Sequence, residues 1–488
     1  MDSVKIGVLT FSDGRKRAAD LVEGQCRTFQ ASLSGYLNRF KHKVVEGKEI
    51  IWNAQTAKAE AERMNAADVD VVIFNFCVWS FPDLAAQTAR DIESPICFLG
   101  NINPSHPGWV AFFAAAGSLD EIGIPFGRIL GDPRDKEVGD QLAKWLQRHD
   151  PDRRAIGYDT ASSLKGLRYG EFDGPSMGMY TGHIDPSQWM EQFGIHVYHR
   201  SQLTLAWLAE RVATERIEAG LEWVESQAAE IRWHPERLTK GSGGHLGRQI
   251  ALYLATKDFM KVEAVDFLGL TGQLDFTEWD RGITMDVPEA LFNDTADWEE
   301  PKKRPTICAT ECDSNGALTM QVLHELSGTP ALFADLRHYF AEEDVYDLVN
   351  SGQHAPWFAT LSDNTKSNWS KVRLHPSNPM YMPCGGASVE FFAAPCPEVT
   401  FARMTRRSGR YQMHFFTGQF VRFDDKTDQA LADQTSPEWP HVFARFDCSQ
   451  ADLAKSYASN HIHAVPGNWM AELEAFCEAT GVEPVILS

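Results

Sequence analysis

The chain has 488 residues but no apolar run of about 18 residues, so we expect no membrane-spanning helix. It has no Walker sequence, no H-E-x-x-H, no G-x-S-x-G and no kinase signature, which excludes the enzyme classes that those motifs define. None of its nine cysteines forms a C-x-x-C pair, so a zinc ribbon or a thioredoxin-like redox site is not expected. The first residues show no basic and apolar leader, and we expect a cytoplasmic protein with reduced thiols.

Basic residues are also in short supply, because 46 Lys and Arg stand against 67 Asp and Glu, for a net charge of -21. Such a charge repels nucleic-acid phosphates and anionic lipid surfaces, so we expect neither partner. Hydrophobic residues make up 43% of the chain, enough for a packed core, and this excludes disorder as the main state.

Strand and helix patterns alternate along the first part of the chain, as in the buried apolar run 69–76 and the helical pattern that follows it. This alternation is typical of parallel βαβ units. We therefore predict an α/β protein with two Rossmann-like α/β domains, residues 1–152 and 153–325, each with a parallel sheet. Residues 326–488 are richer in strand patterns and predict a mainly antiparallel β domain or barrel.

Two carboxylates stand at the ends of predicted strands in the centre of the chain. Glu311 follows the short apolar run 306–310, a helical pattern comes next, and Asp335 follows a second run at 331–334. If the two strands are parallel neighbours, both carboxylates lie at one sheet edge, where they must share a proton or a cation. The alternative is structural, because an acidic residue just before a helix is commonly a cap or a dipole partner.

Two histidines near the C-terminus offer a nitrogen ligand. His461 and His463 point to the same face if this segment is a strand. Oxygen ligands suit Mn²⁺ or Mg²⁺, and one added imidazole favours Mn²⁺. A packed, hydrogen-bonded histidine is the alternative interpretation.

These residues resemble the L-fucose isomerase family and, more distantly, L-arabinose isomerase. Residues Ala309 to Gly316 read A-T-E-C-D-S-N-G, and residues Phe333 to Tyr339 read F-A-D-L-R-H-Y. The 24-residue interval from Glu311 to Asp335 also matches the family pattern. Fainter similarities follow in the family's order over nearly the whole chain.

The resemblance implies an aldose–ketose isomerase, an intramolecular oxidoreductase of carbohydrate metabolism that acts on an open-chain sugar through a cis-enediol. It implies a Mn²⁺ ion held by Glu311, Asp335 and His461, with Mg²⁺ or Co²⁺ as other candidates. Glu311 and Asp335 would also serve as general base and acid, since the reaction takes a proton from one carbon and returns it to the next.

The resemblance further implies a set of sugar-binding residues and a homo-oligomer, a hexamer in the family. The sugar-binding candidates are Arg15, Trp79, Met177, Gln273, Trp439 and Asn460. Trp79 would be supplied by a neighbouring subunit. The alternatives are core or interface packing for the two tryptophans and a surface salt bridge for Arg15.

Two departures from the family pattern bear on the substrate. Cys312 stands where the family has Asn, and Ala387, after two glycines, stands where it has a sugar-contacting Tyr. The chain is also shorter than is typical of the family. We therefore expect a substrate other than plain L-fucose, such as a pentose or a hexose with a larger or charged group at C6. A metal-dependent epimerase or lyase using the same enediolate, and a non-catalytic sugar-binding protein, are the alternative functions.

Overall fold

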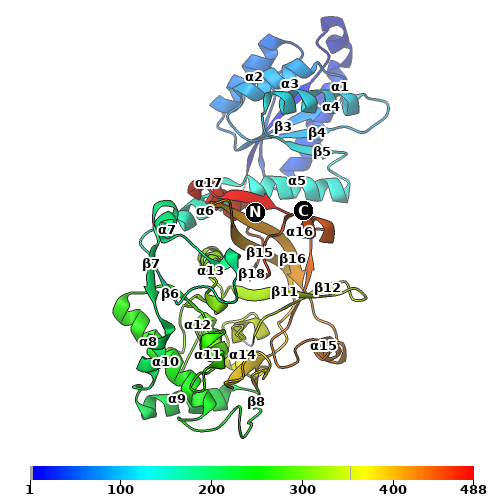
Figure 1. The fold of residues 1–488 in the computed structure, drawn as a ribbon. Helices are drawn as coiled ribbons and strands as arrows, with labels where there is room; N and C mark the ends of the chain where they lie inside the picture. The colour runs from blue at the N-terminus through cyan, green and yellow to red at the C-terminus, as the bar shows by residue number, and fades with distance from the viewer. Residues whose placement is uncertain (1–3, 352, 488) are drawn as a thin grey trace. The chain divides into compact units, whose positions relative to one another are not determined.

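The computed structural model describes residues 4–351 and 353–487 and divides the chain into two compact units, with the boundary between Ile156 and Gly157. In the first unit, five parallel strands form a sheet in the order β2-β1-β3-β4-β5 (Figure 1). The strands are β1 (Lys5–Phe11), β2 (Lys43–Glu46), β3 (Val71–Phe76), β4 (Ile96–Gly100) and β5 (Gly127–Leu130). All residues of β3 are buried, as expected for a central strand with both faces covered.

Helices cover both faces of this first sheet. The helices are α1 (Lys16–Asn38), α2 (Ala54–Ala66), α3 (Pro82–Asp91), α4 (Gly108–Ile122) and α5 (Lys136–Arg148). One apolar cluster joins the sheet to α1 and α5, and another joins it to α2, α3 and α4. Helix α6 (Pro151–Ser163) then runs across the boundary between the units.

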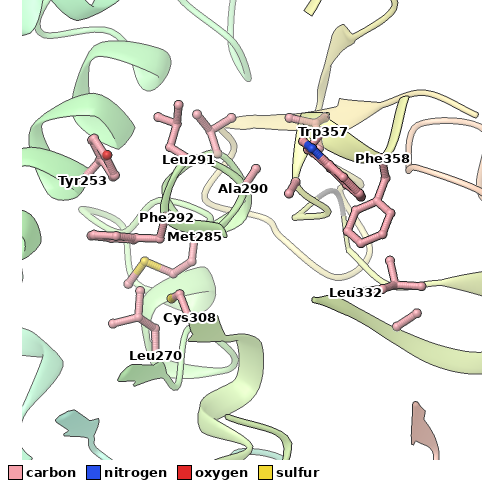
Figure 2. Close-up of a cluster of buried hydrophobic side chains, with 14 of the residues drawn as sticks. Tyr253, Leu270, Met285, Ala290, Leu291, Phe292, Cys308, Leu332, Trp357 and Phe358 are labelled. Atoms are coloured by element: carbon pink, nitrogen blue, oxygen red, sulfur yellow. The ribbon is translucent and has the colours of Figure 1, made fainter. Parts of the chain in front are cut away.

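The second unit contains a parallel sheet of four strands in the order β10-β9-β6-β7. Its strands are β6 (Arg168–Phe172), β7 (His196–Arg200), β9 (Phe267–Leu270) and β10 (Cys308–Ala309). The helices of this region are α7 (Pro186–Phe193), α8 (Gln202–Ala209), α9 (Thr214–Gln227), α10 (His245–Glu263), α11 (Asp275–Glu278), α12 (Asp286–Asn293) and α13 (Ser314–Ser327). Helix α12 is entirely buried, and Figure 2 shows it between Tyr253 of α10 and the aromatic pair Trp357 and Phe358.

The rest of the second unit is built on an antiparallel barrel. Six strands pair in the order β15-β18-β11-β12-β17-β16, the pairing of β15 with β16 closes the ring, and β19 adds parallel to β16. They are β11 (Leu332–Phe340), β12 (Val345–Val349), β15 (Cys396–Arg407), β16 (Arg410–Phe420), β17 (Val442–Phe446), β18 (His461–Pro466) and β19 (Glu483–Ile486).

Shorter elements complete this part of the chain. A small sheet has the order β14-β13-β8. Its strands are β8 (Glu230–Ile231), β13 (Arg373–Pro376) and β14 (Ala387–Glu390), and the remaining helices are α14 (Thr365–Trp369), α15 (Asp425–Ala432), α16 (Gln450–Ser456) and α17 (Met470–Thr480). The predicted fold class, parallel α/β sheets followed by a mainly antiparallel β region, is confirmed.

One expectation about the centre of the chain is wrong. The strands around the two carboxylates are not parallel neighbours, because β10 belongs to the parallel sheet and β11 to the barrel. Asp335 also lies inside β11 rather than after its end. The reason is local: a short turn joins β11 to β12, and strands joined in this way pair antiparallel.

Candidate active site

Glu311 sits in a left-handed turn between β10 and α13. Its φ is 58° and that of Cys312 is 48°, a backbone region that costs a residue other than glycine of order 1–2 kcal/mol. Two hydrogen bonds hold the turn: Ser176 N–H donates to the Glu311 carbonyl over 3.1 Å, and the Cys312 thiol donates to the Gly269 carbonyl over 3.3 Å. The strained turn fixes the direction in which the Glu311 carboxylate leaves the chain.

His461 lies opposite Asp335 on the neighbouring strand, because β18 pairs with β11 in that register. Its Nε2 is 3.5 Å from Asp335 Oδ1 and 3.1 Å from Glu311 Oε2. The structure therefore brings the three predicted ligands to one point. They meet at a ring nitrogen between the parallel sheet and the barrel, not at the edge of one sheet.

The other ring nitrogen of His461 is held by a residue that the sequence did not single out as a ligand. Nδ1 donates to Asp313 Oδ2 over 2.6 Å. Asp313 also caps α13 by accepting from Gly316 N–H over 2.9 Å, and Arg403 of β15 donates to its Oδ1 over 3.0 Å. No local sequence pattern connects Arg403 to Asp313.

The buried charges shift one another's protonation. Burial alone would lower the pKa of His461, but the hydrogen bond that it donates to Asp313 and the nearby Glu311 carboxylate raise it to about 10. Burial alone would raise the pKa of Asp313, yet Arg403 and His461 hold it far below its usual range. Burial raises the pKa of Asp335, and it lowers that of His463, which stays neutral. Without a bound cation, the His461 imidazole is therefore protonated and carries a positive charge among the neighbouring carboxylates.

The donor set fits a divalent cation. Within the described residues, no group of three or more His, Cys, Asp or Glu side chains has the spacing of a formed metal site. However, His461 Nε2 is buried without an aligned hydrogen bond. Neighbouring ligands of an octahedral cation are about 3 Å apart, close to the spacings observed here. Two carboxylates and one imidazole nitrogen also suit Mn²⁺.

Two sugar-binding candidates follow parallel strands of the second unit at the same edge as Glu311. Met177 comes after β6 and Gln273 after β9; β9 pairs with β10, and β6 is the next strand beyond β9. The hydroxyl of Thr271 donates to the Gly174 carbonyl over 2.6 Å and so joins these two loops. Ligands of open α/β sheets bind at this edge, beyond the carboxyl ends of the strands.

Two further candidates lie on the barrel side of the site. Asn460 donates from Nδ2 to Asp335 Oδ1 over 3.1 Å. The guanidinium carbon of Arg337 lies over the ring of Trp439, 4.9 Å from the ring centroid. Arg337 also donates to Asp335 Oδ2 over 3.0 Å. Asn460 therefore touches a predicted ligand directly, and Trp439 reaches it through Arg337, which the sequence interpretation did not select.

Ala387, the departure that suggested a different substrate, is fully buried in β14. The side chain of Gln249 brackets it, since its Nε2 donates to the Ala387 carbonyl over 2.9 Å and its Oε1 accepts from the Ala387 N–H over 2.8 Å. The Ala387 side chain is therefore enclosed by the protein and does not reach solvent.

Arg15 and Trp79 lie in the first unit. They follow β1 and β3, which are parallel neighbours with Phe11 opposite Phe76, so both residues belong to the same sheet edge. The Arg15 side chain is 69% exposed and forms a salt bridge with Asp13, which lowers the pKa of that carboxyl. Trp79 is half-buried and packs near Phe81.

Among the described residues, no helix combines the length and the apolar character needed to cross a bilayer.

Comparison with known proteins finds two matching family models. Residues 3–148 match "L-fucose isomerase, first N-terminal domain", and residues 348–487 match "L-fucose isomerase, C-terminal domain". Together they cover more than half of the chain.

Individual relatives carry the same name at low identity. L-fucose isomerase of Streptococcus pneumoniae (serotype 4, strain TIGR4) is 22% identical over 96% of this chain and 88% of its own length. The Haemophilus influenzae protein of that name is 21% identical over 98% and 89%. That of Escherichia coli O6:K15:H31 is 23% identical over 72% and 66%.

Proposed function

This chain belongs to the L-fucose isomerase family, and we propose that it is a metal-dependent aldose–ketose isomerase acting on an open-chain sugar through a cis-enediol. Family membership makes it a sugar isomerase in general terms, hence an intramolecular oxidoreductase. The cation, the enediol and the identity of the sugar are the proposal.

One observation carries the proposal. Glu311, Asp335 and His461 come from three distant segments, yet both carboxylates lie within 3.5 Å of the same imidazole nitrogen. A binding protein has no need of two carboxylates and an imidazole at one buried point. An isomerase needs such an arrangement, since it holds a cation and moves a proton.

The two carboxylates divide the proton transfer between them. Asp335, whose pKa is raised by burial, is suited to holding a proton, and Glu311 approaches from the opposite sheet. One takes the proton from a carbon of the substrate, and the other returns it to the adjacent carbon or its oxygen. When bound, a divalent cation, with Mn²⁺ preferred, supplies Lewis acidity toward the sugar oxygens. Asn460, which donates to Asp335, is positioned to orient that carboxylate.

The proposal extends to the substrate and the assembly. Met177, Gln273, Trp439 and Asn460 would bind the sugar from the second unit, and Arg15 and Trp79 from the first unit of a neighbouring subunit in a homo-oligomer, a hexamer. The substrate class remains a pentose or a 6-substituted hexose. The first and second parallel sheets and the barrel would act as three domains, 1–152, 153–325 and 326–488.

The direct test is ketose formation from a panel of aldoses by metal-stripped protein, with and without added Mn²⁺, Mg²⁺ or Co²⁺. We expect cation-dependent ketose formation that Glu311→Gln abolishes, by at least about a hundredfold. Glu342→Gln makes the same chemical change in the exposed turn after β11 and should leave the rate unchanged. Cation-independent activity, or full activity of Glu311→Gln, would contradict the proposal.

A further inference from the structure

We propose that Asp313, clamped by Arg403, is a positioning residue that fixes the ring of His461 and directs its Nε2 toward the cation. This inference rests on the proposed metal site and adds a residue to it. Asp313 binds neither the cation nor the sugar in this account and acts only through the imidazole.

The first argument is the contact itself. Nδ1 of His461 donates to Asp313 Oδ2 over 2.6 Å, and the side chains of both residues are 1% exposed. A neutral imidazole has one N–H and one lone pair, so donation from Nδ1 leaves the lone pair on Nε2. That nitrogen is buried without an aligned partner and faces Glu311 and Asp335. A carboxylate behind a metal-binding histidine fixes its tautomer and ring orientation and makes it a better ligand.

The second argument is the clamp on the carboxylate. Arg403 contacts both oxygens of Asp313, through Nη1 to Oδ2 and through Nη2 to Oδ1. Arg403 is itself fully buried, and its guanidinium also donates to the Thr181 carbonyl over 3.1 Å. A two-point contact of this kind holds a carboxylate ionised and prevents it from rotating. Asp313 is therefore a rigid support, held much more tightly than a helix cap requires.

The third argument is the space left for the clamp. A Cβ built on Gly316, in the first turn of α13, would lie 2.7 Å from Asp313 Oδ2 and 2.9 Å from Arg403 Nη1. The close approach of the carboxylate and the guanidinium thus needs glycine at this position. Asp313 and Arg403 therefore pack directly against the first turn of α13, and Asp313 contacts the His461 ring as well.

A capping role alone makes a different prediction. As a cap, Asp313 needs only one oxygen to accept from Gly316 N–H, and Asn can do the same at little cost. Asp313→Asn keeps that cap and the side-chain volume but removes the negative charge behind the imidazole. The two roles separate because a residue that only caps the helix would leave the affinity of the folded protein for the cation unchanged, whereas a positioning residue changes that affinity.

The experiment is calorimetric titration of the full-length, metal-stripped protein with Mn²⁺, together with thermal unfolding of the same metal-free samples. We expect Asp313→Asn to raise the Kd for Mn²⁺ about 10- to 100-fold. It should also lower the unfolding midpoint of the metal-free protein, because the buried Arg403 guanidinium loses its charged partner. The matched control is Asp424→Asn, the same change at the exposed N-cap of α15, which should leave the Kd unchanged.

A second variant keeps the inference testable if Asp313→Asn fails to fold. Gly316→Ala removes no charge and no hydrogen-bonding group, yet its methyl group pushes on Asp313 and Arg403, so it should also weaken Mn²⁺ binding. Its control, Gly117→Ala in α4, meets open space and should not.

The outcomes are distinct. If the unaltered protein binds Mn²⁺ and both site variants bind it equally well, the inference is wrong while the proposed function stands. If the unaltered protein does not bind Mn²⁺, the proposed metal site is wrong and the inference falls with it.

Discussion

His461 connects two groups of charges through its two ring nitrogens. On one side Asp313 holds Nδ1, and on the other Glu311 and Asp335 approach Nε2. Burial opposes the charge of the imidazole, but the carboxylates prevail and raise its pKa to about 10. The ring is therefore protonated at neutral pH in the absence of a cation, and a cation must replace the proton on Nε2.

We predict that Mn²⁺ binding releases about one proton per ion at pH 7.5. At that pH, well below the raised pKa of His461, the imidazole is charged before binding and neutral after it. The affinity should then rise roughly tenfold per pH unit between about pH 7 and pH 9. Calorimetric titration in buffers with different ionisation enthalpies measures the released protons. A binding enthalpy that does not depend on the buffer, with a pH-independent Kd, would show that His461 is not displaced.

Among the elements, the turn between β10 and α13 has the strongest effect on the site. It follows a strand of only two residues, which Asn293 holds by accepting from Cys308 N–H over 3.1 Å and donating to the Cys308 carbonyl over 2.8 Å. The chain then enters the left-handed region at Glu311 and Cys312 before Asp313 starts the helix. The Asn that the family pattern has at position 312 is the non-glycine residue type that adopts this conformation most readily.

We predict that Cys312→Asn folds and retains activity, whereas Cys312→Val is less stable by about 1–3 kcal/mol. Both variants lose the thiol, but Val is β-branched and resists a positive φ, while the Asn amide can donate to Gly269 as the thiol does. Urea unfolding of the two variants measures the difference. Equal stabilities would mean that the turn imposes no conformational requirement at this position.

The sequence predicted three candidate ligands but not how they meet. The A-T-E and F-A-D motifs and the segment around His461 are local patterns, and the structure brings their side chains together; that they bind a cation stays a prediction. Asp335 was expected at a strand end beside Glu311, yet the β11–β18 register brings it to His461. Arg403 could not be found, because its contact with Asp313 depends on the closure of the barrel, and pairings between strands distant in sequence leave no short pattern. The contact of Gln249 with Ala387 also joins segments that are distant in sequence, so no short pattern predicts it.

At the scale of the whole molecule, the residues singled out from the sequence fall in two units that have separate hydrophobic cores. The three candidate ligands, Asp313 and Arg403 belong to the second unit. Arg15 and Trp79 belong to the first, where they follow neighbouring strands of its parallel sheet. In the proposed homo-oligomer, the first unit of one subunit would complete the site of another, so that both parts of the chain would be used.

We predict that activity rises when two variants, one impaired and one inactive, are co-expressed. Trp79→Ala should lower kcat/KM while leaving Mn²⁺ affinity intact, and Glu311→Gln should abolish turnover. In a mixed oligomer, the Glu311→Gln subunit supplies an intact Trp79 to the intact metal site of its neighbour. The measurement is the specific activity of the purified mixture against each variant alone. No recovery in a mixed oligomer would mean that Trp79 does not act across a subunit boundary.

The central claim is that Glu311, Asp335 and His461 hold a cation and isomerise a sugar through an enediol. It is tested most directly by proton NMR of an aldose panel in D₂O with metal-stripped protein, before and after addition of Mn²⁺. The account predicts that a ketose forms with deuterium at C1 and that deuterium also enters C2 of the remaining aldose, both only with Mn²⁺ and neither with Glu311→Gln. Deuterium exchange without ketose would instead identify an epimerase or lyase. Ketose formation that proceeds equally without Mn²⁺ would contradict the account.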